Sequence, residues 1–217
     1  MNDGFVTARV YPGKTNALVK NLMRQMGISD PNEAVRRMNA GEWVVHPIAQ
    51  ATKVLTIDRT TLFDPSAFIG KGHSIWRGPL EGDGLLGEEE QDARSLLLTE
   101  VDFTKVTFET ALRDGDPVIT GEEKLKRLVA SGVIRLDDGI FLALWNDYQK
   151  NKAESVLESL RKEKRFTYLD FFGTILRDPN CHRCVLYLYH AAGEWRWRTG
   201  WLDHGWLADV RSVVLAS

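Results

Sequence analysis

The chain has 217 residues, of which 43% are hydrophobic, so it can bury a sizeable core as one large domain or as one main domain with a small appendage. Its 28 basic and 30 acidic residues give a formal net charge of −2, which offers no overall electrostatic case for binding nucleic acid or an anionic membrane. The N-terminus lacks the basic and apolar regions of a signal peptide, and no apolar run approaches the ~18 residues needed to span a bilayer. We therefore expect a soluble protein without membrane insertion, which is cytoplasmic, exported by an unconventional route, or associated with a virion.

Residues 1–52 are predicted to form a small strand-helix-helix segment. Alternation from Phe5 to Tyr11 indicates a short strand, and Thr15 can cap a helix that Gly27 ends. The sequence Asp30-Pro31-Asn32-Glu33 is typical of a helix start, and Gly41 would end this second helix. Residues 57–94 are rich in glycine, proline and aspartate, so we expect long ordered loops with few regular elements there.

Regular structure is predicted again from Val101. Apolar alternation over 106–112 indicates a half-buried strand, followed by a turn at 114–117. Thr120 to Glu123 has the pattern of a capping box that opens a helix through Ala130, which Gly132 ends. An apolar stripe over 140–148 predicts an amphipathic helix, and the charged segment 150–165 can continue as a surface helix. Strands are predicted at 166–176, 184–189, 194–201 and 210–216.

Four of the seven tryptophans lie in the last 23 residues, at positions 195, 197, 201 and 206. Trp195, Trp197 and Trp201 share one parity, whereas Arg196 and Arg198 have the other. In an extended strand this pattern places the rings on one face and the guanidinium groups on the opposite face. A rigid aromatic scaffold that presents polar side chains suits recognition better than chemistry.

Two apparent motifs have plainer interpretations. The segment Ala8 to Thr15 fits the permissive form of a phosphate-binding loop, but the loop needs a buried parallel strand before it and this segment itself has the pattern of the strand. Cys181 and Cys184 form a single C-x-x-C pair, which supplies at most half of a zinc site, so two incidental cysteines at a turn are the default.

Nothing in the sequence anchors catalysis. The histidines at 46, 73, 182, 190 and 204 show no metalloprotease spacing, and no nucleophile elbow is present. Asp203 and His204 are adjacent and are expected to point apart as solvated turn residues. We therefore expect no enzyme activity, no cofactor and no metal site.

The C-terminal segment carries a resemblance to a known family. Gly193 to Trp197, Trp201 to Asp203, Trp206, and Ser212 to Ser217 together resemble the variable region of C-type-lectin-fold proteins diversified by retroelements, in the formylglycine-generating-enzyme-like group. Residues 57–79, 121–137 and 171–174 are similar to members of the same family, so the resemblance covers about 53–217. It implies an α+β fold of C-type-lectin type, with small antiparallel sheets, two flanking helices and long loops.

The resemblance also implies which positions vary. Error-prone copying at adenines would scatter substitutions over ligand-facing positions in about 184–217 and leave Trp195, Trp197, Trp201, Trp206 and Leu215 as the fixed scaffold. The implied variable, ligand-binding residues are Tyr189, His190, Arg196, Arg198, Thr199, His204, Gly205, Leu207, Ala208, Asp209 and Val210.

The expected function is therefore non-catalytic recognition of a protein or surface ligand by domain 53–217, with no nucleic-acid partner. Calcium is not expected, because the Glu and Asn ligand cluster of sugar-binding lectins is missing from the sequence. Two alternatives stay open. One is an enzyme of the formylglycine-generating kind that uses Cys181 and Cys184, and the other is a nucleotide-binding protein that uses the 8–15 loop with Lys14.

Overall fold

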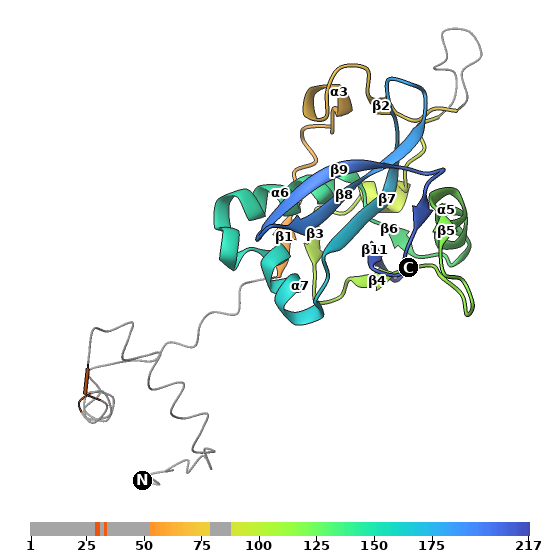
Figure 1. The fold of residues 1–217 in the computed structure, drawn as a ribbon. Coiled ribbons are helices and arrows are strands. Elements are labelled where there is room, and N and C mark those ends of the chain that lie inside the picture. Colours follow the sequence, from red (N-terminus) through yellow and green to blue (C-terminus); the bar gives the residue numbers. More distant parts are fainter. Residues whose placement is uncertain (1–28, 31–32, 34–52, 79–87) are drawn as a thin grey trace. The chain divides into compact units, whose positions relative to one another are not determined.

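The computed structural model describes residues 29–30, 33, 53–78 and 88–217 (Figure 1). The chain divides into two compact units, Met1–Ala49 and Gln50–Ser217. Apart from Glu33, which is helical, the strand, the two helices and the 8–15 loop predicted in the N-terminal segment lie outside the described residues. Within the part of the chain that is described, no helix is long and apolar enough to cross a membrane.

The longest strands of the second unit lie in its second half. In chain order its strands and helices are β1 (Val54–Thr56), α3 (Pro65–Phe68), β2 (Ser74–Ile75), α4 (Ala93–Leu96), β3 (Glu100–Asp102), β4 (Thr107–Glu109), β5 (Ile119–Thr120), α5 (Gly121–Ala130), β6 (Ile134–Arg135), α6 (Asp138–Asn151), the 3-10 helix η1 (Lys152–Glu154), α7 (Val156–Lys164), β7 (Tyr168–Arg177), β8 (Arg183–Ala191), β9 (Glu194–Trp201), β10 (Gly205–Trp206) and β11 (Val210–Leu215).

A mixed sheet with the strand order β4-β11-β7-β8-β9 forms the centre of this unit, with β2 beside β7 and β6 beside β11. β7, β8 and β9 pair antiparallel in sequence order, whereas β11 runs parallel to β7. Two smaller sheets pair β1 with β3 and β5 with β10. The α+β class is confirmed. The central sheet is mixed and not purely antiparallel, because the chain returns after β9 and inserts its last strand between β4 and β7.

The helices begin at side-chain caps. The hydroxyl of Thr120 accepts a hydrogen bond from the Glu123 N–H at the start of α5, and the carboxylate of Asp137 accepts bonds from the Gly139 and Ile140 N–H groups at the start of α6. Such caps satisfy N–H groups that have no partner within the helix. The predicted helices 120–130 and 140–148 are therefore confirmed.

The segment 150–165 differs from its prediction as a continuing surface helix. Lys152 has a positive φ of 43°, and η1 separates α6 from α7. A non-glycine residue rarely adopts this backbone conformation, and it breaks the helix. The new helix α7 starts at the cap Ser155 and buries three apolar side chains in the core, namely Val156, Leu157 and Leu160.

The strand predicted at 106–112 is shorter in the structure. β4 covers only Thr107–Glu109, with Phe108 packed against the core, and Ala111 has a φ of 57° that ends the extended backbone. The turn at 114–117 is confirmed, since the Asp116 N–H donates to the Arg113 carbonyl oxygen. The four later strands form at the predicted places, and the described parts of 57–94 hold few regular elements, as expected.

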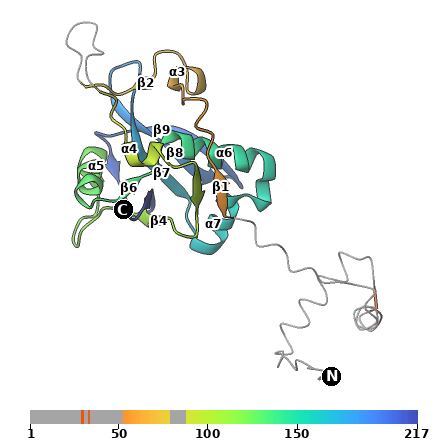
Figure 2. The same ribbon diagram turned by 180° about the vertical axis from the view of Figure 1, so that it is seen from behind.

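Each side of the sheet packs against its own group of apolar residues. On one side α6 and α7 cover a large cluster that includes Phe141, Phe171 and Trp195 (Figures 1 and 2). On the other side α5 packs Leu125 and Leu128 against a smaller cluster that includes Trp206. We name these the α6 side and the α5 side of the sheet. The α5 side is covered only in part, and it carries the candidate site described below.

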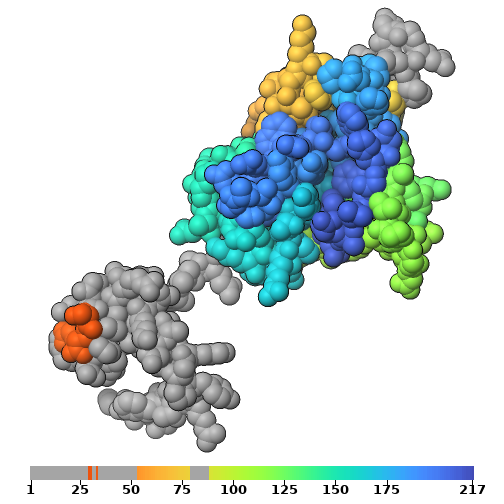
Figure 3. Space-filling model, viewed as in Figure 1, coloured from red at the N-terminus to blue at the C-terminus, as the bar shows by residue number. Residues whose placement is uncertain are grey.

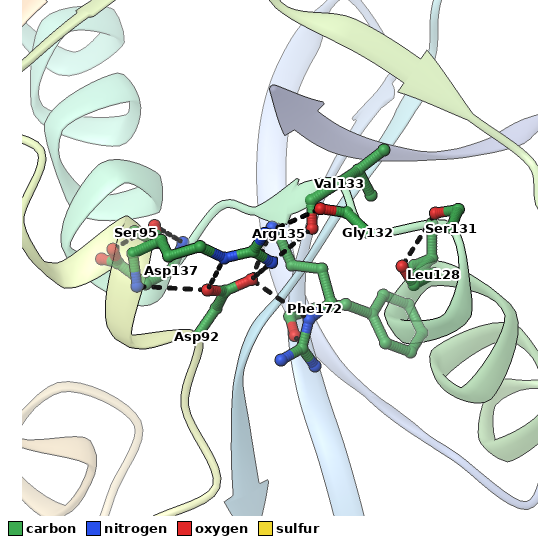
Figure 4. A network of polar contacts seen from close by, with 10 residues as sticks. Asp92, Ser95, Leu128, Ser131, Gly132, Val133, Arg135, Asp137 and Phe172 are labelled. Carbon is green, nitrogen blue, oxygen red and sulfur yellow. Dashed lines mark hydrogen bonds and ion pairs between the residues drawn. The ribbon is translucent and has the colours of Figure 1, made fainter. Parts of the chain in front are cut away.

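A buried polar network ties α4 to β6 (Figure 4). The carboxylate of Asp92 accepts hydrogen bonds from the Arg94 side chain and from the Arg135 N–H. The Arg135 side chain in turn donates to the Phe172 carbonyl oxygen of β7 at 3.2 Å. Burial raises the pKa of Asp92, but these hydrogen bonds outweigh burial and hold the pKa below its ordinary value. The carboxylate therefore stays charged and paired at the edge of the core.

The tryptophan scaffold leads to a stability prediction. Trp195 is 2% exposed and belongs to the large cluster, so Trp195→Ala is expected to lower the free energy of unfolding by about 3–5 kcal/mol. Trp201 is 37% exposed and belongs to neither cluster, so Trp201→Ala should cost much less. Urea unfolding of both variants measures the two values, and equal losses would contradict the assignment of faces.

Candidate ligand-binding site

Tyrosines and arginines from three neighbouring strands gather on the α5 side of the sheet. In an antiparallel pair, residues opposite each other project to the same side. Tyr189 of β8 lies opposite Tyr168 of β7 and Arg196 of β9, and Tyr187 lies opposite Arg198. We name these five residues the tyrosine–arginine face. Figure 3 looks onto the molecule as in Figure 1, and the C-terminal strands in blue lie uncovered between the teal and green segments.

The three tyrosine rings of this face lie close together. The centroids of Tyr168 and Tyr189 are 6.3 Å apart with nearly parallel rings, and the Tyr187 centroid is 5.8 Å from that of Tyr189. The tyrosines are half-buried, whereas Arg196 and Arg198 are exposed. Partial burial raises the pKa of Tyr187 and the Arg198 charge opposes this rise, so the phenol keeps its proton and can donate or accept a hydrogen bond.

Arg198 has no acidic partner among the described residues. Its guanidinium lies over the Tyr189 ring, 5.5 Å from the centroid. Arg196 lies 3.8 Å from the Glu194 carboxylate, and both of these side chains are more than half exposed, so this pair contributes little. The face therefore presents the Arg198 guanidinium over an aromatic ring, and no acidic side chain among the described residues occupies its N–H donors.

A pocket adjoins the tyrosine–arginine face. It has a volume of about 190 Å³, enough for roughly six waters at ~30 Å³ each. A Cβ atom on Gly200 would lie 3.1 Å from the Trp206 ring, so a glycine at this position lets the indole lie against β9. We name it the C-terminal pocket, and its lining residues are Tyr168, Tyr187, Gly200, Trp201, His204, Gly205, Trp206 and Val210.

A buried ion pair supports this pocket from inside. The Lys124 ammonium of α5 donates to the Asp170 carboxylate at 2.7 Å and to the Val210 carbonyl oxygen at 3.0 Å, and both charged side chains are fully buried. The same ammonium lies 5.1 Å from the centroid of the Trp206 ring. Burial raises the pKa of Asp170, whereas the Lys124 charge lowers it. One cation thus fixes two residues of the pocket wall, Trp206 and Val210.

The structure brings most of the predicted variable residues to this region. Tyr189, Arg196 and Arg198 belong to the tyrosine–arginine face, and His204, Gly205 and Val210 line the pocket. The remaining residues on this part of the chain, in the loop between β10 and β11, are exposed, namely Leu207, Ala208 and Asp209.

Two predicted variable residues lie on the α6 side instead. Thr199 is opposite Leu186, a member of the large cluster, because its parity is that of Trp197 and not that of Arg198. The resemblance implies that Thr199 is a ligand-facing position like Arg198, but its side chain lies on the opposite side of β9. His190 is opposite Trp195, and their ring centroids are 5.6 Å apart.

The scaffold tryptophans also differ from one another. Trp195 and Trp206 are buried, and the half-buried Trp197 packs its ring 4.7 Å from that of Phe68. Trp201 instead contacts the rings of His182 and His204, each with a centroid distance of 5.0 Å, and lines the C-terminal pocket. Its parity predicted a core position, but β9 ends at this residue and the ring lies at the edge of the sheet.

Sequence reasoning missed Tyr168, Tyr187 and the ion pair between Lys124 and Asp170. Tyr187 had a usable signal, because Tyr187 and Tyr189 alternate with Leu186 and Leu188. The ion pair joins residues 46 positions apart in different elements, and no local pattern marks it.

The cysteines have unlike surroundings. Cys181 is exposed and its sulfur accepts a hydrogen bond from Arg177, whereas Cys184 is buried in β8. Burial, together with the charges of Asp178 and Asp138, raises the pKa of Cys184 to about 12, so its thiol stays protonated at neutral pH. Both cysteines are free. Among residues 53–78 and 88–217, no group of three or more His, Cys, Asp or Glu side chains could hold a metal ion.

Asp203 and His204 are exposed turn residues, as expected. The His204 ring nitrogen lies 4.0 Å from the Asp203 carboxylate, which is beyond a hydrogen bond.

The buried pair leads to a prediction about stability and pH. Lys124→Met leaves the Asp170 charge buried without its partner and should cost about 3–5 kcal/mol of unfolding free energy. The loss should shrink as the pH falls towards 3.8, the ordinary aspartate pKa, because Asp170 in the folded variant then takes up a proton at little cost.

The matched control is the double variant Lys124→Met, Asp170→Leu, which removes both charges and should be more stable than the single variant. Urea unfolding over a range of pH measures all three proteins. A single variant that is as stable as the double variant at neutral pH would contradict the prediction.

Comparisons of this chain with protein-family models, with curated proteins and with solved structures found no match.

Proposed function

We propose that the tyrosine–arginine face and the C-terminal pocket together form the ligand-binding surface of a non-catalytic recognition protein. The observation that carries this proposal is Arg198, an exposed guanidinium that forms no ion pair with any described residue and lies over the Tyr189 ring beside an aromatic pocket. Tyrosine and arginine are the residues that contribute most often to the energetic centre of protein interfaces. Their clustering on one open sheet face favours binding over a structural role.

The chemistry of the surface points to a protein ligand that combines an aromatic side chain with an acidic one. The pocket wall holds four aromatic rings and His204, so it suits an inserted ring. The neighbouring guanidinium groups suit a carboxylate, which they can bind through two parallel hydrogen bonds. A partner with acidic side chains is also attracted by the charges of Arg196 and Arg198, because no buried carboxylate among the described residues pairs with either of them.

The surface is rigid enough for this task. Tyr168, Tyr187, Tyr189, Arg196 and Arg198 all lie on long paired strands and not on loops. The α6 side of the same strands is filled by the large core cluster. Side chains on such a scaffold lose little conformational freedom when a ligand binds, which favours affinity.

We also propose that the domain has a C-type-lectin-type fold and that a retroelement diversifies it at the variable positions named above. The exposed or pocket-lining positions of Arg196, Arg198 and His204 support it, since substitutions there leave the core untouched. The neighbouring DNA tests this point. A reverse transcriptase gene together with a near-copy of the segment that encodes about 184–217 is expected, and a locus without both would refute the diversification.

A binding experiment tests the recognition surface. Peptides selected from a random display library on the intact protein are expected to be rich in aromatic residues next to Asp or Glu. Arg198→Gln should weaken their binding at least about tenfold, because it removes the charged donors, and should change the unfolding free energy by no more than about 0.5 kcal/mol.

Arg211→Gln is the matched control. Arg211 is also a strand residue over an aromatic ring, 5.8 Å from the centroid of Phe166, but it lies in β11 with the parity of Val213 on the α6 side. This variant should bind the selected peptides as the unchanged protein does. Selected peptides that bind equally to both variants would place the ligand site elsewhere, and selection of single-stranded nucleic acid over peptides would replace the proposed ligand class.

A further inference from the structure

A second cavity lies at the start of α6, and none of its residues belongs to the surface described above. Its volume is about 240 Å³, enough for roughly eight waters at ~30 Å³ each. Apolar side chains form part of its wall, and charged or polar ones form the rest. Its wall includes the apolar residues Phe63, Ile75 and Leu96 and the charged residues Arg59, Asp137 and Asp138.

Two adjacent aspartates that line this cavity differ sharply in the partners of their carboxylate groups. Asp137 accepts two hydrogen bonds from the Arg59 guanidinium at 2.9 Å and one from the Ser95 hydroxyl at 2.5 Å. It also accepts the N–H groups that it caps at the start of α6, and Figure 4 shows it beside Ser95. The hydrogen-bonding capacity of Asp137 is therefore fully used.

Asp138 is the opposite case. It is 1% exposed, and neither of its carboxylate oxygens has a hydrogen-bond partner among the described residues. Its N–H donates to the Thr174 hydroxyl oxygen at 3.4 Å, but this bond leaves the carboxyl group unpaired. Native proteins seldom bury a carboxyl group without a partner, because the loss of hydration is not offset.

The charges around Asp138 are predominantly negative. The neighbouring Asp137 and the burial of the side chain both raise the pKa of Asp138 well above its ordinary value, with burial as the larger cause. Arg59 is the cation of the cavity wall, and Asp137 already binds it. Glu89, also in the wall, pairs with Arg77, which lies outside it.

We propose that this cavity binds a small organic monocation, a primary ammonium compound with a short apolar chain, through the carboxylate of Asp138. The ammonium group supplies the charge and the hydrogen-bond donors that this carboxylate lacks. The proposal is independent of the recognition surface, since the two sites share no residue.

The size and wall of the cavity define the ligand further. Phe63, Ile75 and Leu96 offer apolar contacts for a short alkyl chain. A metal ion fits less well, because the oxygens of Asp137 are already occupied and no third acidic or imidazole ligand completes a cluster within the described residues. The free carboxylate takes one charge, which a monocation supplies.

Binding involves a balanced proton exchange. Without the ligand Asp138 holds a proton below its raised pKa. When the ammonium compound binds, the carboxyl group releases this proton to the solvent and forms an ion pair with the ammonium, whose own protons are unchanged. Each bound cation should therefore release about one proton, and no covalent bond forms.

Calorimetric titration of the full chain with n-alkylammonium chlorides from methyl to hexyl tests the proposal, with the matching alcohols as uncharged probes. Mildly acidic buffers of different ionisation enthalpy report the protons released. We expect saturable binding of the ammonium series with an optimum chain length, release of about one proton for each cation, and no binding of the alcohols.

Asp138→Asn keeps the shape of the side chain and resembles its protonated form, so this variant should fold and should lose the binding and the proton release. Asp203→Asn, which changes an exposed aspartate outside the cavity, is the control and should keep both. Absence of binding by every ammonium probe, or equal binding by Asp138→Asn, would overturn the proposal. If Asp138→Asn fails to fold, titration of Asp138→Glu decides, since this variant keeps the carboxylate and must still bind a cation.

Discussion

The buried ion pair between Lys124 and Asp170 determines how the C-terminal half is assembled. The lysine lies on α5, and its ammonium reaches the carboxylate on β7 and a backbone carbonyl on β11. A buried ion pair is tolerated only when the two charges meet in good hydrogen-bond geometry. The helix α5 and the strands β7 and β11 must therefore take one relative position. The indole of Trp206 packs against the same ammonium. A charged contact therefore specifies a packing that apolar contacts alone would leave less defined.

This contact also decides where the sheet stays open. A Cβ atom on Gly121 would lie only 2.6 Å from the Trp206 ring nitrogen, so α5 approaches the β10 region as closely as a backbone can. Beyond this contact β8 and β9 extend past the helix, and among the described residues no element covers Tyr187, Tyr189 and Arg198 on the α5 side. The proposed recognition surface is thus the part of a rigid sheet that the short helix α5 does not reach.

Local signals in the sequence predicted local structure well. The capping pattern at Thr120 and the alternation over 194–201 gave the bounds of α5 and β9, because both depend on neighbours within one turn or one strand. The insertion of β11 beside β7, the exposed position of Trp201 and the partner of Lys124 depend on residues far apart in the chain. Periodicity carries no information about such contacts, so the ion pair between Lys124 and Asp170 was missed while Tyr189 and the arginines were found.

The start of α6 shows how a strong local signal can coexist with an unsatisfied group. Asp137 acts as the cap and gathers Arg59 and Ser95, which stabilises the helix end. Asp138 follows in the first turn, where the helix dipole favours negative charge, yet its buried carboxyl group has no hydrogen-bond partner in the described part of the chain. The dipole lowers the cost of a charge there but supplies no hydrogen bond to the carboxylate. In our proposal a cation that enters the cavity supplies this bond, and this end of the helix then selects a ligand of opposite charge to the one proposed for Arg198.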